Sequence, residues 1–211
     1  MPMPVKIKIL ERKFNLKKFL TLTLIFFVFS ASVALAKKPV RIARLPIIVQ
    51  SNKLDAETAA ALETKFSRAV KIPLNQTLQI AEYIPPSESE TVLKQIWQDM
   101  YAQNKHSKIA DAVKIFADEI NADLVVCPVL RRYSQSISQM SFSFETRLSS
   151  NVSAELIVYD KTANNLIDKK TYRRFNDSYI RFGTKSYLAG ECFDQLIKET
   201  GLRKIIQSMK G

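Results

Sequence analysis

Apolar residues recur at the three- and four-residue spacing of amphipathic helices in three segments of the first half of the chain. These segments span residues 56–72, 87–103 and 108–120. Asp55 precedes the first segment as an N-cap, and Ser87 with Glu90 matches the capping box that opens the second. The pattern therefore predicts three helices in this half of the chain.

Strand patterns separate these helices. Short β-rich runs lie at residues 40–49 and 76–84, and Pro46 places the first run at a sheet edge or a bulge. The run LVVCPVL, residues 124–130, is apolar throughout, which suits a strand buried on both faces.

From Tyr133 to Phe175 polar and apolar residues alternate with a period of two, as in half-buried strands. The parity of the apolar positions changes along this segment, which predicts a bulge near Ser138. After Gly183 the helical spacing returns and predicts two more helices, with Gly201 as the C-cap of the first. The alternating segments span residues 133–148, 152–158 and 166–175.

This order of elements predicts an α/β (α+β) fold with one mixed β-sheet of about five or six strands covered by helices. The predicted order is β-α-β-α-α-β-β-β-β-α-α, within a single globular domain over residues 37–211.

The first 36 residues have the three parts of a secretory signal peptide. Six Lys and Arg residues precede an apolar run from Phe19 to Leu35, and Ala34-Leu35-Ala36 supplies small residues for cleavage. The alternative is an uncleaved anchor, since the run is at the lower limit of a membrane span. We expect cleavage after Ala36 and a periplasmic or extracellular protein.

Removing this leader also changes the charge. The chain has 32 Lys and Arg against 20 Asp and Glu, a net charge of +12, and the leader holds six of the bases and one of the acids. The mature net charge is therefore +7, which favours anionic surfaces without requiring nucleic acid. Export makes nucleic acid an unexpected partner.

Two cysteines, Cys127 and Cys192, would enter an oxidising compartment and could form a disulfide. The alternative is that both are buried small hydrophobic residues, because each lies in an apolar segment.

Three phrases carry a resemblance to known families: VRIARLPI from residue 40, INADLVVCPVL from residue 120, and VSAELIVYDKTANNLIDKKTYRRF from residue 152. They resemble the amino-terminal domain of the Tol-Pal translocation protein B and the periplasmic domain of the curli-secretion lipoprotein. The resemblance implies an exported α/β envelope domain that binds other proteins. The chain lacks the lipid-anchor cysteine of the curli protein and the β-propeller of the Tol protein, so no functional residue carries over.

Catalytic motifs are missing from the sequence, and we predict a protein that is not an enzyme and has no cofactor or metal. The single histidine, His106, lies in a polar junction without a metal-binding motif, and Gly-x-Ser-x-Gly is absent. Asp118, Glu119 and Asp123 cluster near a helix end, where solvated carboxylates are usual. Asp160 is expected to bond its own backbone in a turn.

Basic residues concentrate in the arm 166–175. Lys169 and Arg173 have one parity along this strand and Lys170 and Arg174 the other, so the charges divide between its faces. One interpretation is an edge strand that is protected against unwanted pairing, and the other is a contact for an anion or a partner. The second would be enlarged if the fold brought four further residues near: Arg131, Arg132, Arg181 and Lys185.

These observations predict a non-catalytic exported envelope protein that acts as a protein-docking module, with another envelope protein as partner. The alternative is a binder of anionic envelope polymer or lipid headgroups through the basic surface. A third hypothesis, an enzyme that uses carboxylates alone, requires a pocket with convergent polar groups.

Overall fold

The computed structural model describes residues 39–51, 53–71, 81–139, 146–178 and 180–209. These residues form five α-helices, one 3-10 helix and six β-strands. In chain order the elements are β1 (Val40–Arg44), β2 (Ile48–Val49), α2 (Ala56–Val70), β3 (Ala81–Ile84), α3 (Pro86–Gln103), α4 (Ile109–Glu119), β4 (Leu124–Gln139), β5 (Thr146–Asp160), β6 (Asn165–Ser178), η1 (Arg181–Gly183), α5 (Lys185–Glu199) and α6 (Leu202–Met209).

The six strands form one mixed sheet in the order β3-β1-β4-β5-β6, with β2 also paired to β4. β1 runs parallel to β3 and β4, whereas β4, β5 and β6 form an antiparallel meander. The parallel pairs follow from helical crossovers, because a chain must travel the length of the sheet before it can pair in parallel. The predicted fold class is therefore confirmed, and the order of elements agrees broadly with the prediction.

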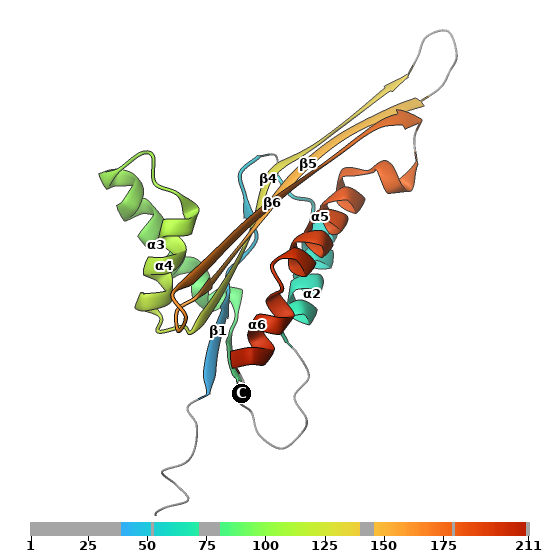
Figure 1. The fold of residues 1–211 in the computed structure, drawn as a ribbon. Helices are drawn as coiled ribbons and strands as arrows, with labels where there is room; N and C mark the ends of the chain where they lie inside the picture. The colour runs from blue at the N-terminus through green and yellow to red at the C-terminus, as the bar shows by residue number, and fades with distance from the viewer. Residues whose placement is uncertain (1–38, 52, 72–80, 140–145, 179, 210–211) are drawn as a thin grey trace, which may run out of the picture. The chain divides into compact units, whose positions relative to one another are not determined.

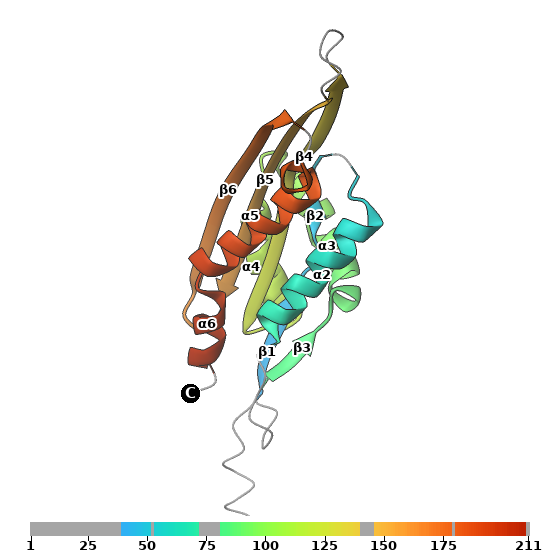
Figure 2. The ribbon, with the colours of Figure 1, turned by 90° about the vertical axis from the view of Figure 1, so that its right-hand side faces the viewer.

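Helices cover both faces of this sheet. α2, α5 and α6 pack on one side, called here the α5 face, and α3 and α4 pack on the other, called the α4 face (Figures 1 and 2). The apolar spacing read from the sequence explains the helix orientations. In α4, for example, Val113 and Phe116 are buried against the sheet.

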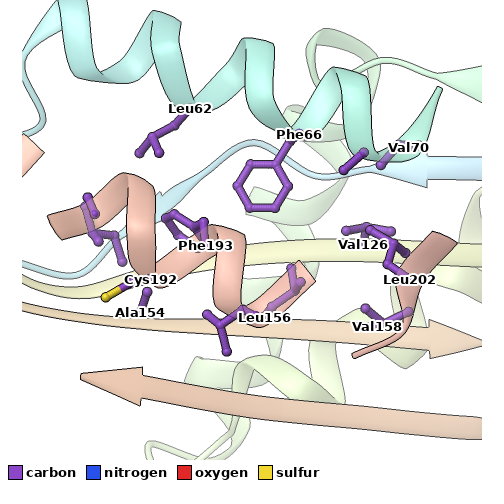
Figure 3. Close-up of a cluster of buried hydrophobic side chains, with 14 of the residues drawn as sticks. Leu62, Phe66, Val70, Val126, Ala154, Leu156, Val158, Cys192, Phe193 and Leu202 are labelled. Carbon is purple, nitrogen blue, oxygen red and sulfur yellow. The ribbon is translucent and has the colours of Figure 1, made fainter. Parts of the chain in front are cut away.

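The core on the α5 face is centred on two aromatic rings. Phe66 of α2 and Phe193 of α5 meet edge to face, with ring centroids 4.9 Å apart. Leu62, Leu156 and Leu202 pack in the same buried cluster (Figure 3). Aromatic pairs of this geometry add to the stability gained from burial, so the cluster ties both helices to β5.

The strands β4, β5 and β6 are much longer than the others and extend beyond the helices as a three-stranded ribbon (Figure 1). Burial changes along the ribbon: β5 is fully buried from Ala154 to Tyr159 but alternates between buried and partly exposed residues nearer its start. α3 and α4 cover the α4 face only near Cys127 and Ile157. The outer part of that face is therefore polar.

Two details of the strand prediction were wrong. The four strands predicted between residues 124 and 175 are three, because 124–130 continues into β4 and the segment around 152–158 belongs to the longer β5. The bulge in the described part of β4 lies between Leu130 and Arg132, not near Ser138. Pro46 lies between β1 and β2 and pairs with no strand, which agrees with the prediction of an edge or a bulge at this position.

The predicted capping box was also wrong. α3 begins at Pro86 with Pro85 as N-cap, because the proline ring already has the dihedral angle that a first helical residue needs. The strand predicted at 76–84 is described only from Ala81, as β3, and residues 76–80 lie outside the described residues. The signal peptide predicted over residues 1–36 also lies outside them.

Gly201 follows the end of α5 with a φ of 64°, a left-handed conformation that glycine adopts without strain. Its role as the residue that ends this helix agrees with the sequence prediction. No described helix is long and apolar enough to cross a membrane.

Candidate functional site

The strand β6 lies at one end of the sheet and pairs only with β5 among the described strands (Figure 2). It is 14 residues long, and most of its residues are exposed. In an antiparallel pair, alternate residues direct their N–H and C=O groups away from the neighbouring strand. The outer edge of β6 is therefore a row of backbone donors and acceptors without a strand partner in the described part of the chain.

The register of β6 divides its four basic residues between the two faces. Lys169 is opposite Leu156 and Arg173 is opposite Val152, both of which belong to the core of the α5 face. Lys170 is opposite Glu155, and Arg174, four residues further along, shares its parity. Lys170 and Arg174 therefore lie on the α4 face.

Glu155 is the centre of a charged group on the α4 face, called here the Glu155 cluster: Glu155, Arg131, Lys170 and Asp168. The Glu155 residue is only 2% exposed, and its carboxylate accepts a hydrogen bond from Nε of Arg131. Lys170 Nζ lies 3.7 Å from the same carboxylate and 3.3 Å from Asp168. The hydrogen bond to Glu155 raises the pKa of Arg131. Two of the predicted basic residues are thus brought together by a buried acid.

Arg131 reaches Glu155 because it is the extra residue of the bulge in β4. Val129 is paired with Glu155 and Arg132 with Ser153, so Arg131 has no partner in the ladder. Its Nη1 also donates to Oε1 of Gln50, at 3.2 Å. The sequence contained a signal for a bulge in this strand, but the parity change pointed to a position further along.

The remaining predicted residues divide between two surfaces. Arg132 lies on the α4 face with Arg131, Lys170 and Arg174, because it is paired with Ser153, two residues from Glu155. On the α5 face, Arg173 Nη2 donates to Oε1 of Gln195 in α5, at 2.7 Å. Arg181 begins η1 and Lys185 begins α5, on this second face. The eight residues therefore form two groups of four and not one patch.

Sequence reasoning missed a polar group that joins α2 and α5, called here the Tyr133 network: Tyr133, Asp55, Thr58 and Ser186. The hydroxyl of the buried Tyr133 donates to Oδ2 of Asp55 at 2.6 Å and lies 3.1 Å from the hydroxyls of Thr58 and Ser186. Thr58 Oγ1 donates to Ser186 Oγ at 2.8 Å. No short motif could have revealed this group, since its members lie on three elements far apart in sequence.

The Tyr133 network also explains the electrostatics of Asp55. The hydrogen bonds from Tyr133 and Thr58 lower the pKa of Asp55 to about 2, and burial raises the pKa of Tyr133. Asp55 is the N-cap of α2, as predicted, where the backbone N–H of Thr58 donates to Oδ1 at 2.8 Å. The helix N-terminus supplies a further favourable field for this carboxylate.

A cleft of about 540 Å³ opens between α2 and α5 beside Thr58 and Ser186. Lys65 crosses it to pair with Asp194, and its Nζ also donates to the backbone carbonyl of Gly190 at 3.0 Å. Glu57, Glu191 and Arg181 line the rest of the opening. Charges of both signs are therefore mixed along its walls, and no single ligand chemistry is indicated.

Other sequence candidates have structural partners. Asp118 pairs with Lys161 at 2.9 Å, and Asp123 Oδ2 accepts the backbone N–H of Arg41 at 2.8 Å. Asp160 accepts from the backbone N–H of Ala163 at 3.0 Å, which confirms its role in the turn. His106 is exposed, and its backbone N–H donates to Asn104. In the described residues, no three His, Cys, Asp or Glu side chains are placed to hold a metal ion.

The two cysteines do not form a disulfide in the structure. Both thiols are free and buried, with Cys127 in the core of the α4 face and Cys192 in that of the α5 face. The disulfide alternative is therefore corrected in favour of two buried hydrophobic residues. Burial raises the pKa of both thiols, that of Cys192 to about 11, so neither is an activated nucleophile.

No protein-family model matches the chain, and no curated protein is significantly similar to it in sequence. Solved bacterial structures with a comparable arrangement include the lipoprotein GNA1162 from Neisseria meningitidis, with 14% identity, a TM-score of 0.39, and coverage of 76% of this chain and 99% of that one. The hypothetical protein CT253 from Chlamydia trachomatis has 13% identity, a TM-score of 0.42, and coverage of 80% and 99%. A PelC dodecamer from Paraburkholderia phytofirmans has 12% identity, a TM-score of 0.38, and coverage of 77% and 91%.

These likenesses are too distant to support an argument about function. None of the three is a Tol-Pal or curli-secretion protein, so the resemblance to those two families stays a prediction.

Proposed function

We propose that the protein is a non-catalytic component of the cell envelope that docks a partner protein through the open edge of β6. The observation that carries this proposal is the length of that edge: 14 residues pair with β5 on one side only among the described strands. An extended segment of a partner can add to such an edge through backbone hydrogen bonds, and side chains on either face then supply specificity.

The charges on β6 favour a partner over a second copy of the same strand. Lys169 and Arg174 form no ion pair among the described residues, whereas Lys170 and Arg173 are held by Glu155 and Gln195. Two β6 strands placed side by side would bring like charges together, which is unfavourable. An acidic extended segment would instead pair with Lys169 on one face and with Arg174 on the other.

The location and the lack of catalysis are expectations from the sequence. The leader over residues 1–36 predicts export, and the mature chain has no recognisable catalytic motif. Docking to another envelope protein is the function that best unites these expectations with an accessible sheet edge.

Photo-cross-linking in cells that express the protein tests the proposal. Probes at Lys170 and Arg174 should give a discrete protein adduct, while a probe at the exposed Lys105, between α3 and α4, should not. A discrete protein adduct from Lys105 alone would retain docking but overturn the β6 edge as its site. No protein adduct from any of the three probes would overturn the docking function.

Neighbouring proline variants sharpen the test. One of Arg173→Pro and Arg174→Pro removes an N–H that points outward, and the other removes an N–H that bonds to β5. The variant that removes the outward N–H should lose the protein adduct at Lys170. It should also keep more thermal stability than the variant that removes the N–H bonded to β5. Retention of the adduct by that variant would exclude strand addition.

The alternative, binding of anionic envelope polymer or lipid through β6, has a distinct outcome. Lipid or polysaccharide adducts at Arg174, without a protein adduct, would favour it. Binding through charge alone would also weaken steeply with salt, whereas backbone pairing would be less sensitive.

A further inference from the structure

Four of the seven large apolar side chains that are exposed in the described part of the chain belong to one end of the β4–β6 ribbon: Ile137, Ile180, Phe182 and Tyr187. Phe182 is 62% exposed, and its ring meets that of Tyr187 edge to face with centroids 5.0 Å apart. Soluble proteins usually scatter such side chains singly. A group of this kind therefore indicates a binding surface.

Close packing holds this group in place. A Cβ atom on Gly183 would lie 2.3 Å from the ring of Phe175, so only glycine allows η1 to approach β6 this closely. The backbone N–H of Lys185 donates to Oε1 of Gln135 at 2.9 Å, two residues before Ile137 on the same face of β4. Phe182 is therefore presented to solvent from a firmly attached turn.

Charged residues of both signs lie near the group. Arg181 and Arg147 are exposed and form no ion pair among the described residues, but Arg147 is paired with Ser138 and Ser178 and therefore lies on the α4 face, across the sheet from Ile137. Lys185 places its Nζ 4.3 Å from the ring centroid of Tyr133. The acids are Asp177, whose Oδ1 accepts the backbone N–H of Ser178, and Glu57 and Glu191, which line the cleft with Arg181 and Tyr187.

We propose that this aromatic tip, defined as Ile137, Ile180, Phe182 and Tyr187 with Arg181 and Lys185, binds an anionic phospholipid surface. Aromatic rings with a polar end favour the boundary between headgroups and acyl chains, and basic side chains contact anionic headgroups. An exposed apolar group beside Arg181 and Lys185 matches both layers of such a surface. This contact is separate from the β6 edge and would hold the protein at a membrane while the edge docks a partner.

Tryptophan fluorescence tests insertion of the tip directly. Trp97 is the single tryptophan, so the variant Trp97→Phe/Phe182→Trp reports only on the tip. Its emission should shift to the blue with vesicles of phosphatidylglycerol and phosphatidylcholine, and not with phosphatidylcholine alone. The matched control is Trp97→Phe/Tyr101→Trp, which reports on an exposed position of α3 and should not shift.

Vesicle co-sedimentation gives a second measurement that needs no change at Trp97. Phe182→Ala should lower the partition coefficient on phosphatidylglycerol vesicles by about tenfold, because burial of one phenylalanine side chain is lost. Arg181→Gln should lower it by about fivefold at low salt.

The proposal is overturned if the tryptophan at position 182 does not shift with anionic vesicles, or if the one at position 101 shifts equally. It is also overturned if Phe182→Ala binds as well as the unmodified protein. If the aromatic tip does not bind vesicles, the protein adduct at Lys170 should still form. If that adduct is absent, vesicle binding by the tip should be unchanged, so the two proposals can fail separately.

Discussion

On the α4 face, Glu155 is almost completely buried and is held by two cations, whereas on the α5 face the buried Tyr133 is held by one carboxylate and two hydroxyls. Both groups are centred in the antiparallel strands, yet their chemistry differs. The difference follows from how far the helices cover each face of the sheet.

The α4 face is uncovered beyond Val129, so the long side chains of Arg131 and Lys170 can reach Glu155 while their charged ends remain partly in water. This lowers the desolvation cost of the cations, although Glu155 itself still depends on them. On the α5 face, α2 and α5 close over the sheet. Short side chains at their N-termini satisfy the tyrosine hydroxyl without burying a cation.

The comparison also separates the two proposed surfaces. The uncovered α4 face and the edge of β6 provide backbone groups and charges that suit an extended partner segment. The α5 face ends at the aromatic tip, where Phe182 and Tyr187 are presented beside Arg181. One sheet thus carries a polar surface and an apolar surface at different places.

The largest expected effect comes from breaking the Glu155 cluster. Arg131→Leu leaves Glu155 with only the more distant Lys170, and we expect a loss of about 2–4 kcal/mol in the free energy of unfolding. Urea denaturation measures this loss. The double variant Arg131→Leu/Glu155→Leu should recover most of it, and a double variant as unstable as the single one would show that Glu155 needs no counter-charge.

A smaller effect is expected in the Tyr133 network. Asp55→Asn keeps the N-cap acceptor but removes the charge, and should cost about 1 kcal/mol at neutral pH after allowance for solvent screening. Because the pKa of Asp55 is lowered from 3.8 to about 2, its stabilisation is present above pH 3.8 and is lost as the pH falls through 2.

The difference in unfolding free energy between the unmodified protein and Asp55→Asn should therefore shrink between these two pH values. Thermal denaturation across this range measures it. A difference that stays constant from neutral pH to pH 2 would show that the carboxylate does not have a lowered pKa.

The smallest effect distinguishes the two cations of the Glu155 cluster. Lys170→Met should change the unfolding free energy by less than about 1 kcal/mol, because the ammonium is half exposed and 3.7 Å from Glu155. An equal loss from Lys170→Met and Arg131→Leu would contradict the assignment of Arg131 as the principal partner. The same urea titration provides both values.

Much of the fold could be predicted from local patterns. The buried positions of α4 and the division of Lys169, Lys170, Arg173 and Arg174 between two faces follow from helix and strand periodicity. Strand lengths were harder to predict. In the outer ribbon no helix covers the α4 face, so the residues there are polar and resemble loop residues in the sequence.

The candidate site was predictable only in part. The sequence indicated that Arg131 and Lys170 could meet if the fold allowed it, but it did not indicate that the buried Glu155 would join them. Asp55 is the N-cap of α2, whereas Tyr133 and Ser186 lie on β4 and α5, and no periodicity relates positions on different elements.

By itself, the sequence determined the types of the elements, the faces that each buries and the parity of the charges on β6, since these depend on spacing within one segment. Only the tertiary structure decided that Cys127 and Cys192 lie on opposite sides of the sheet, that Arg131 reaches Glu155 and that β6 ends the sheet. These outcomes depend on the order in which strands pair and on the helices that cover them. Pairing order is set by the packing of the whole domain, and no single segment encodes it.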